Sequence, residues 1–328
     1  MRIGSNPNIH KTIDINGTSH RVIIPVYIPN AEGYFEDAFA VLKVCINSLL
    51  ATINSDTAVS IISNGSSVEV NAYIYDLWIE GKVDRAILNK ENVGKMNAIV
   101  TETRASFEEF ITYSDADVFF DKGWLKQTFK MFQNVSKAGF VSMNPTPVNY
   151  MHADSTLIKK IGTVLFNRKK TNTVCDFSDL EHFHKSVGKD KSFTEKMFQS
   201  SVFSVSKENY IIGAGHFCCT IRRTPTLKFV PKEKCNIGVS GGSESIYLDI
   251  PFDKTGLLRL SSPKAYVWHM GNILEKEWVA TKNHDLEGFK EENFTFHNLQ
   301  KDVFNINVIP YAIKVPLVKV LKKLKIIN

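Results

Sequence analysis

Between residues 21 and 143, short apolar runs alternate with longer segments in which apolar residues recur at helical spacing. The runs predict strands at 21–26, 58–63, 83–88, 110–113, 118–120 and 139–143. The segments between them predict helices at 34–53, ending near 80, at 95–104 and at about 121–135. This alternation predicts an α/β fold with a mostly parallel central sheet flanked by helices. Ligands of such sheets bind beyond the carboxyl ends of the strands.

The second half of the chain is less regular. Residues 144–210 have weak periodicity and are rich in Lys, His, Ser and Asn, which predicts loops and short helices, one of them near 156–166. Because loops often carry specificity, we expect them to form part of an acceptor pocket. Beyond them, the sequence predicts a helix from the glycines at 241–242 to about 254 and strands near 216–223, 257–260 and 265–268.

Two acidic residues follow the apolar run at 110–113. Residues two apart on extended backbone point to the same side, so Asp115 and Asp117 present both carboxylates to one spot. Two carboxylates at the end of a buried strand repel each other and are costly to desolvate, and a divalent cation would offset both effects. The pattern predicts a Mn²⁺ or Mg²⁺ site that can hold a diphosphate, although a solvated surface turn carries the same short motif.

Composition narrows the class of protein. The 328 residues are 43% hydrophobic, which supports a sizeable core, and we find no repeat, signal-peptide pattern or apolar run long enough to span a bilayer. The five cysteines are odd in number and include no Cys-x-x-Cys. A disulfide framework and a zinc ribbon are therefore disfavoured, and we expect a cytoplasmic protein.

The net charge of +6 is concentrated at the end of the chain, where five lysines follow Ile309 with no acid beside them. The rest of the chain is nearly balanced, which argues against nucleic acid as a partner. Residues 310–328 place apolar side chains on one helical face and lysines on the other. This pattern predicts an amphipathic helix, either docked peripherally on an anionic membrane surface or packed on the domain with its lysines in solvent.

Four motifs in order resemble a GT-A glycosyltransferase of family 2. They are the first strand and its loop, VIIPVYIPN, the turn ISNGS after the second strand, the segment NVGKMNA at 92–98, and SDAD at 114–117. Each motif is short, but their order and spacing together are fairly specific. The resemblance covers roughly residues 21–272 and excludes the tail. Asn64 departs from the family pattern, which usually has an aspartate there.

The resemblance implies a nucleotide-sugar donor and a set of residues that bind it. The first loop and the second-strand turn would hold the base and ribose, and Lys95 behind Gly94 would meet phosphate, although a solvated helix lysine would look the same. Asp117 would bind the metal directly, and Asp115 would contact the ribose or the metal. The implied donor-binding residues are Pro25, Tyr27, Asn64, Asn92, Gly94, Lys95, Asp115 and Ala116.

The resemblance also suggests a catalytic base and a third metal ligand. Family members have a glycine pair near a Glu-Asp pair whose acid deprotonates the acceptor hydroxyl, and here Glu244 is present while Ser245 replaces the second acid. Glu244 is the expected base, with Asp249 as the alternative and a helix-capping Glu244 as the structural reading. His269 resembles a histidine that completes the metal or diphosphate site, and a buried structural histidine is the rival reading.

We therefore expect four segments: an arm at 1–20, a nucleotide-sugar-binding half at 21–143, an acceptor-binding half at 144–272 and a helical extension at 273–328. The implied activity is metal-dependent, inverting transfer of a hexosyl or N-acetylhexosaminyl group from a nucleoside diphosphate sugar. A UDP-sugar is the favoured donor. The implied acceptor is a saccharide or lipid-linked hydroxyl in bacterial-type surface polysaccharide synthesis. The alternatives are a sugar-phosphate nucleotidyltransferase and a non-catalytic nucleotide-sugar-binding module. A nucleotidyltransferase usually has a Gly-rich, basic loop near its N-terminus, and this sequence has no such run there.

Overall fold

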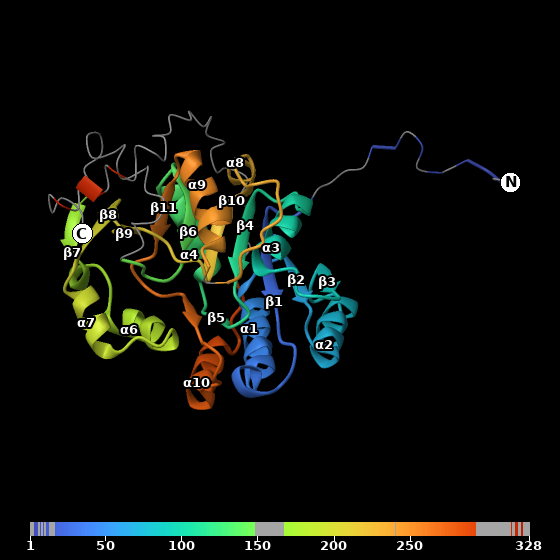
Figure 1. Cartoon of the computed structure of the whole chain (residues 1–328), viewed down its shortest axis with the longest axis horizontal. Helices are drawn as coiled ribbons and strands as arrows, with labels where there is room; N and C mark the ends of the chain where they lie inside the picture. The colour runs from blue at the N-terminus through green and yellow to red at the C-terminus, as the bar shows by residue number, and fades with distance from the viewer. Residues whose placement is uncertain are drawn as a thin grey trace.

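The computed structural model describes residues 17–147, 167–239 and 241–292, with isolated positions outside these ranges. The described strands form a sheet in the order β3-β2-β1-β4-β10-β6-β11-β9-β8-β7, with a separate two-stranded sheet of β12 and β5. Figure 1 shows β3 near one end of the molecule and β7 near the other. Strands β10, β9 and β7 run against the others, so most strands share one direction.

The first half of the chain follows the predicted alternation. Its strands are β1 (His20–Val26), β2 (Thr57–Asn64), β3 (Arg85–Asn89), β4 (Phe110–Ser114), β5 (Val118–Phe120) and β6 (Ala138–Ser142). Its helices are η1 (Gly33–Phe35), α1 (Ala38–Thr52), α2 (Val68–Ile79), α3 (Lys95–Ala105) and α4 (Trp124–Asn134). Because β2 and β4 are buried along their whole length and β1 at every position except Pro25, their apolar runs need helices on both faces.

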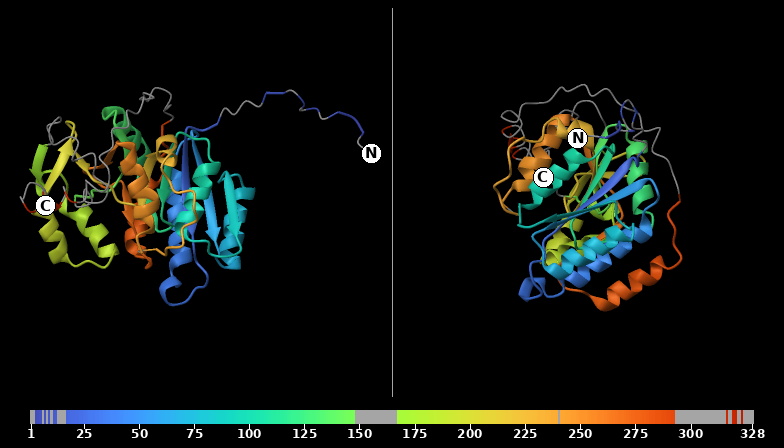
Figure 2. Two further views of the ribbon diagram at one scale, coloured as in Figure 1. Left: turned by 45° about the horizontal axis from the view of Figure 1, so that its top comes forward. Right: turned by 90° about the vertical axis from the view of Figure 1, so that its right-hand side faces the viewer.

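Helices cover both faces of the central strands. Helices α1, α2 and α4 pack on one face, around a core that includes Leu42, Ile74 and Phe129. Helix α3 packs on the other face together with a segment from the second half, around Ile99 and Phe252. Figure 2 shows these two layers on opposite sides of the sheet. The carboxyl ends of β1, β2 and β4 consequently meet at one edge between the layers.

The second half contains more structure than its weak periodicity predicts. Its strands are β7 (Asn167–Lys170), β8 (Ser201–Val205), β9 (Tyr210–Ile212), β10 (Cys218–Arg222), β11 (Leu258–Ser261) and β12 (Val267–His269). Its helical elements are η3 (Thr171–Thr173), α6 (Phe177–Ser186), α7 (Lys191–Phe198), α8 (Arg223–Leu227), the π-helical turn η4 (Ser245–Asp249), α9 (Ile250–Thr255) and α10 (Lys276–Leu286). Helix α10 packs beside α1.

Two predictions lie outside the described residues: the short helix near 156–166 and the amphipathic helix at 310–328, apart from isolated positions in the latter. The proposed boundaries at 20, 143 and 272 stay predictions, and strands from both halves share the large sheet. All five cysteines are buried and free. No helix among the described residues is long and apolar enough to cross a membrane.

Candidate active site

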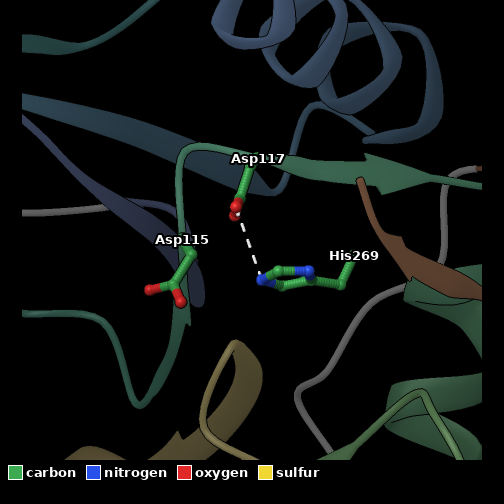
Figure 3. A group of neighbouring side chains, drawn as sticks. All are labelled: Asp115, Asp117 and His269. Atoms are coloured by element: carbon green, nitrogen blue, oxygen red, sulfur yellow. Dashed lines mark ion pairs between the residues drawn. The ribbon is translucent and has the colours of Figure 1, made fainter. Parts of the chain in front are cut away.

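An acidic corner lies where β4 ends and the chain turns into β5. Asp115 and Asp117 occupy this turn, and His269 ends β12, which pairs with β5 so that His269 stands opposite Val118. One ligand atom from each of the three side chains lies within 4.8 Å of the others. Figure 3 shows the His269 ring facing Asp117, with Nε2 3.4 Å from Oδ2. The structure thus brings together the three residues predicted to bind metal.

Asp117 is poorly compensated in this corner. Its Oδ1 atom is buried and has no hydrogen-bond partner among the described residues. Burial raises the pKa of the Asp117 carboxyl to about 6, even though the nearby His269 opposes that change. A buried acceptor without a partner is costly, so the corner requires a positive charge or a donor that the described side chains do not supply.

The hydrogen bonds of Ser186 determine which nitrogen of His269 carries the proton. The Ser186 hydroxyl, at the end of α6, lies 2.7 Å from the carbonyl of Phe183 and 3.0 Å from Nδ1 of His269. A carbonyl only accepts, so the single hydroxyl hydrogen goes to Phe183, and Nδ1–H of the neutral ring donates to Ser186. The lone pair of Nε2 then faces Asp117. His182 further fixes the segment through Nε2, 3.1 Å from the His269 carbonyl.

The corner therefore fits a divalent cation. Two carboxylates and an imidazole lone pair converge, and one carboxylate oxygen lacks any described partner. Carboxylate oxygen with imidazole nitrogen is a donor set that suits Mn²⁺ and related ions, while Mg²⁺ favours oxygen alone. The residues present could hold such a metal ion.

Lys95 links the corner to the start of α3. Its ammonium group forms an ion pair with Oδ1 of Asp115 and lies 3.9 Å from Oε1 of Glu244. Burial lowers the pKa of Lys95, but Asp115 outweighs that effect and holds the pKa above its ordinary value. Gly94, at φ +87°, gives the backbone conformation that begins the helix directly before this lysine. Lys95 is therefore a fixed positive charge at the sheet edge.

The Asn64 side chain forms hydrogen bonds with the loop that precedes α3. Its Oδ1 atom accepts the backbone N–H of Val93 at 3.0 Å, and its Nδ2 donates to Oδ1 of Asn92 at 2.8 Å. An aspartate here could accept the first bond but could not donate the second, which gives a physical reason for the amide. Gly65 lets the two loops approach, because a Cβ there would lie 2.7 Å from the backbone nitrogen of Asn92.

A cavity of about 600 Å³ opens beside the acidic corner. Every residue predicted to bind the donor lines it: Pro25, Tyr27, Asn64, Asn92, Gly94, Lys95, Asp115 and Ala116. Asp117 lines it as well. The rest of the wall was not predicted from the sequence and includes Tyr34, Phe35, the segment 235–239, Gly271 and Asn272. These residues come from loops distant in sequence, and no local pattern marks them. The binding roles themselves stay predictions.

The two candidate bases have different surroundings. Glu244 lies beside Lys95 and accepts a hydrogen bond from Ser243 at 2.8 Å. Asp249 is buried and is paired with both Arg259 and His216, so it does not present a free carboxylate to a substrate. His216 was not predicted as part of the site, because a single histidine two residues before a strand reads as an ordinary loop or strand residue.

A model of the Glycosyl transferase family 2 family matches residues 22–203, which is more than half of the chain. The chain belongs to glycosyl transferase family 2. The predicted family is thereby confirmed, and with it the predicted fold class of a mostly parallel sheet flanked by helices. The match includes all four motifs named above, from the first strand to the paired aspartates.

Solved structures of glycosyltransferases resemble this family 2 chain weakly. The mannosyltransferase PcManGT of Pyrobaculum calidifontis, in complex with GDP-Man and Mn²⁺, is 13% identical with a TM-score of 0.44, covering 78% of this chain and 59% of its own. Residues 1–349 of S. aureus TarS are 14% identical with a TM-score of 0.44, covering 77% and 60%. GalNAc-T7 with UDP, GalNAc and Mn²⁺ is 14% identical with a TM-score of 0.46, covering 78% and 44%.

The chain therefore spans less than two thirds of each of these solved chains. A search of curated protein sequences gave no match.

Proposed function

We propose that this family 2 member transfers a sugar from a nucleoside diphosphate sugar to a hydroxyl group, with a divalent metal ion bound at the acidic corner. One observation carries the proposal: the Asp115, Asp117 and His269 cluster adjoins a cavity of about 600 Å³ that Lys95 also lines. The two aspartates can bind a metal ion and Lys95 can bind phosphate, and both lie beside the same cavity. This combination suits a pyrophosphate group. UDP-sugars are the first donors to test.

The metal site would use the three side chains of the corner. Asp117 and the Nε2 lone pair of His269 are the best placed ligands, and Asp115 can add a carboxylate while it keeps Lys95 in position. A divalent ion bound here would supply positive charge to the diphosphate leaving group. Lys95 would add a second positive charge, held at the cavity wall by its ion pair.

The remaining walls of the cavity suit a nucleoside. Tyr27 and Phe35 pack edge to face at 5.8 Å and offer an aromatic surface at the opening. Asn64 fixes another part of the wall, the loop at 92–94, through the amide of Val93 and the side chain of Asn92. Aromatic and amide side chains beside the acidic corner support a base and ribose next to a diphosphate as the ligand.

The acceptor hydroxyl must lose a proton at the same edge of the sheet. Among the described residues there, Glu244 and the imidazole of His216 can both accept it. Attack from the face of the sugar opposite the diphosphate inverts the anomeric centre. We place the acceptor in the class of saccharides or lipid-linked saccharides of surface polysaccharide synthesis, and the transferred group in the hexosyl or N-acetylhexosaminyl class.

Calorimetry with UDP and GDP, each with and without Mn²⁺, tests the donor site directly. We expect one of the two to bind with Mn²⁺ and to bind at least tenfold more weakly in EDTA, a difference of about 1.4 kcal/mol. Asp117→Asn should remove the metal dependence without lowering the melting temperature of the metal-free protein, because the change removes a poorly compensated buried charge. Equal binding in EDTA would contradict the metal role.

Transfer itself is tested by incubating the protein with UDP-glucose, UDP-N-acetylglucosamine and GDP-mannose. Slow release of the nucleoside diphosphate, with the anomer of the freed sugar read by NMR, distinguishes an enzyme from the alternative of a non-catalytic binding module. Ser245 keeps that alternative open, because a hydroxyl stands where family members have an acid. Binding without any turnover would support the module.

A further inference from the structure

His216 lies at the edge of the sheet that carries the acidic corner. Strand β10 is antiparallel to β4, with Cys218 opposite Ser114, so its beginning lies where β4 ends. The pairing continues beyond the strands, since the carbonyl of Phe217 accepts the backbone N–H of Asp115 at 2.7 Å. Neighbouring strands lie about 4.8 Å apart, so the backbone of His216 is close to the turn that holds both aspartates.

Asp249 fixes one nitrogen of the His216 ring. Its Oδ1 atom accepts hydrogen bonds from Arg259 and, at 2.6 Å, from Nε2 of His216. Burial raises the pKa of Asp249, but Arg259 and His216 together outweigh that effect and hold the pKa below its ordinary value. A carboxylate that stays ionised can only accept, so Nε2 carries a hydrogen. The 3.4 Å approach of Arg259 to Nε2 then joins two donors and contributes no hydrogen bond.

The other ring nitrogen is free to react. In the neutral ring Nδ1 holds a lone pair when Nε2 carries the hydrogen, and no described residue hydrogen-bonds to Nδ1. The His216 side chain is 28% exposed, whereas Asp249 and Arg259 are 3% and 2% exposed. A partly exposed imidazole oriented by a buried carboxylate is the arrangement that enzymes use for a general base.

We propose that Nδ1 of His216 takes the proton from the acceptor hydroxyl, with Asp249 as a positioning residue; this inference rests on the proposed glycosyl transfer. The hydroxyl proton passes to Nδ1, and the oxygen forms a bond to the anomeric carbon. The bond from that carbon to the diphosphate oxygen breaks, and its electron pair leaves on the nucleoside diphosphate. Asp249 stabilises the imidazolium that results, while Arg259 keeps the carboxylate ionised.

This assignment accounts for the departure at Ser245. Family resemblance places the second acid at 245, whereas Asp249 lies one turn later, at the end of the π-helical turn at 245–249. The Asp249 carboxylate is buried and cannot contact the substrate itself. The partly exposed imidazole of His216, which is hydrogen-bonded to Asp249, would contact the acceptor hydroxyl instead. Glu244 instead lies 3.9 Å from Lys95, on the side of the corner where Asp115 and the donor cavity lie.

Chemical rescue tests the base directly. In the presence of Mn²⁺, hydrolysis of UDP-glucose, UDP-N-acetylglucosamine and GDP-mannose is measured for wild type, His216→Ala and the exposed control His284→Ala. We expect His216→Ala to lower kcat by about 10²- to 10⁴-fold, while the affinity for UDP or GDP stays unchanged. Added imidazole should restore turnover to His216→Ala in proportion to its concentration and leave His284→Ala unaffected.

Two further variants separate the roles. Asp249→Asn should also lower kcat but should respond less to imidazole. Its melting curve shows whether the protein still folds when Arg259 has lost its charged partner. Glu244→Gln should retain more turnover than His216→Ala. The inference is overturned if His216→Ala turns over like His284→Ala, or if its loss is one of nucleotide affinity that imidazole does not restore. Nucleotide binding by a wild type that hydrolyses no donor would instead overturn the proposed transfer, and the base with it.

Discussion

Nδ1 of His269 lies 3.0 Å from the hydroxyl of Ser186, so helix α6 orients the ring that faces Asp117. Replacing this hydroxyl should free the ring to rotate or to change tautomer. We expect Ser186→Ala to weaken Mn²⁺ binding by about 10- to 100-fold, measured by calorimetry or by the EPR signal of free Mn²⁺. Ser178→Ala, an exposed position on the same helix, serves as the control. Unchanged Mn²⁺ affinity in Ser186→Ala would contradict the orienting role.

Lys95 should act on the diphosphate more than on the nucleoside. Lys95→Met removes the positive charge that is paired with Asp115 and leaves Glu244 facing the same space without it. UDP or GDP affinity should fall by about tenfold or more, equal to about 1.4 kcal/mol, while uridine or guanosine affinity changes little. The matched control is Lys90→Met, which alters an exposed lysine on the neighbouring loop. An equal loss for nucleoside and nucleotide would place Lys95 elsewhere in the complex.

Gly65 should be irreplaceable for two separable reasons. Its φ of +83° disfavours any other residue, and a Cβ would lie 2.7 Å from the backbone nitrogen of Asn92. Gly81 has a similar φ of +70° but open space around it. We expect Gly81→Ala to cost about 1 kcal/mol of unfolding free energy and Gly65→Ala about 2–4 kcal/mol, with weaker nucleotide binding only in the second. Equal urea midpoints for the two variants would show that the loops can separate freely.

His20 should make the protein acid-sensitive. The ring is fully buried between Thr57 and Thr112, and burial lowers its pKa to about 3, with Glu108 opposing and Arg21 adding to the effect. Between pH 6.5 and 3 the unfolded state binds the extra proton, so the free energy of unfolding falls as the pH falls through that range.

From pH 7 to pH 5, wild type should therefore lose about 2 kcal/mol more stability than His20→Gln does. Urea unfolding at both pH values measures this difference. His284→Gln, at an exposed position, should behave like wild type. A parallel pH dependence in wild type and His20→Gln would mean that His20 is already charged or exposed in the folded state.

The first half was predicted well because its strands, apart from the partly exposed β3, are almost entirely buried apolar runs and its helices alternate with them. The pair Asp115 and Asp117, with Lys95 and Asn64, could be assigned to one edge because they follow strands of a parallel sheet. Strands β7 to β9 were missed because they are short, and because β7 pairs with β8 and β9 with β11 across long stretches of sequence, so local periodicity carries little of the information. His269 was found through resemblance alone.

His216 shows what no local pattern reveals. The pair it forms with Asp249 joins positions 33 residues apart, and its place at the site depends on β10 running against β4. The same is true of Ser186, whose partner His269 is 83 residues away. Such pairs depend on how helices and strands pack against one another. Hydrophobic patterns in a single sequence predict the individual helices and strands but not these contacts between them.

The small ladder of β5 and β12 contains only three residue pairs, ending with His269 opposite Val118. Sliding one chain by a single position would turn the imidazole to the other face and bring Trp268 or Met270 in its place, since successive side chains on a strand alternate. The bond from Met270 N–H to the Asp117 carbonyl, at 2.8 Å, and the bond from Asp121 N–H to the Tyr266 carbonyl, at 3.0 Å, extend the ladder at its two ends and oppose such slippage. We therefore expect an insertion or deletion of one residue between positions 262 and 267 to leave the large sheet folded but to abolish metal binding at the acidic corner.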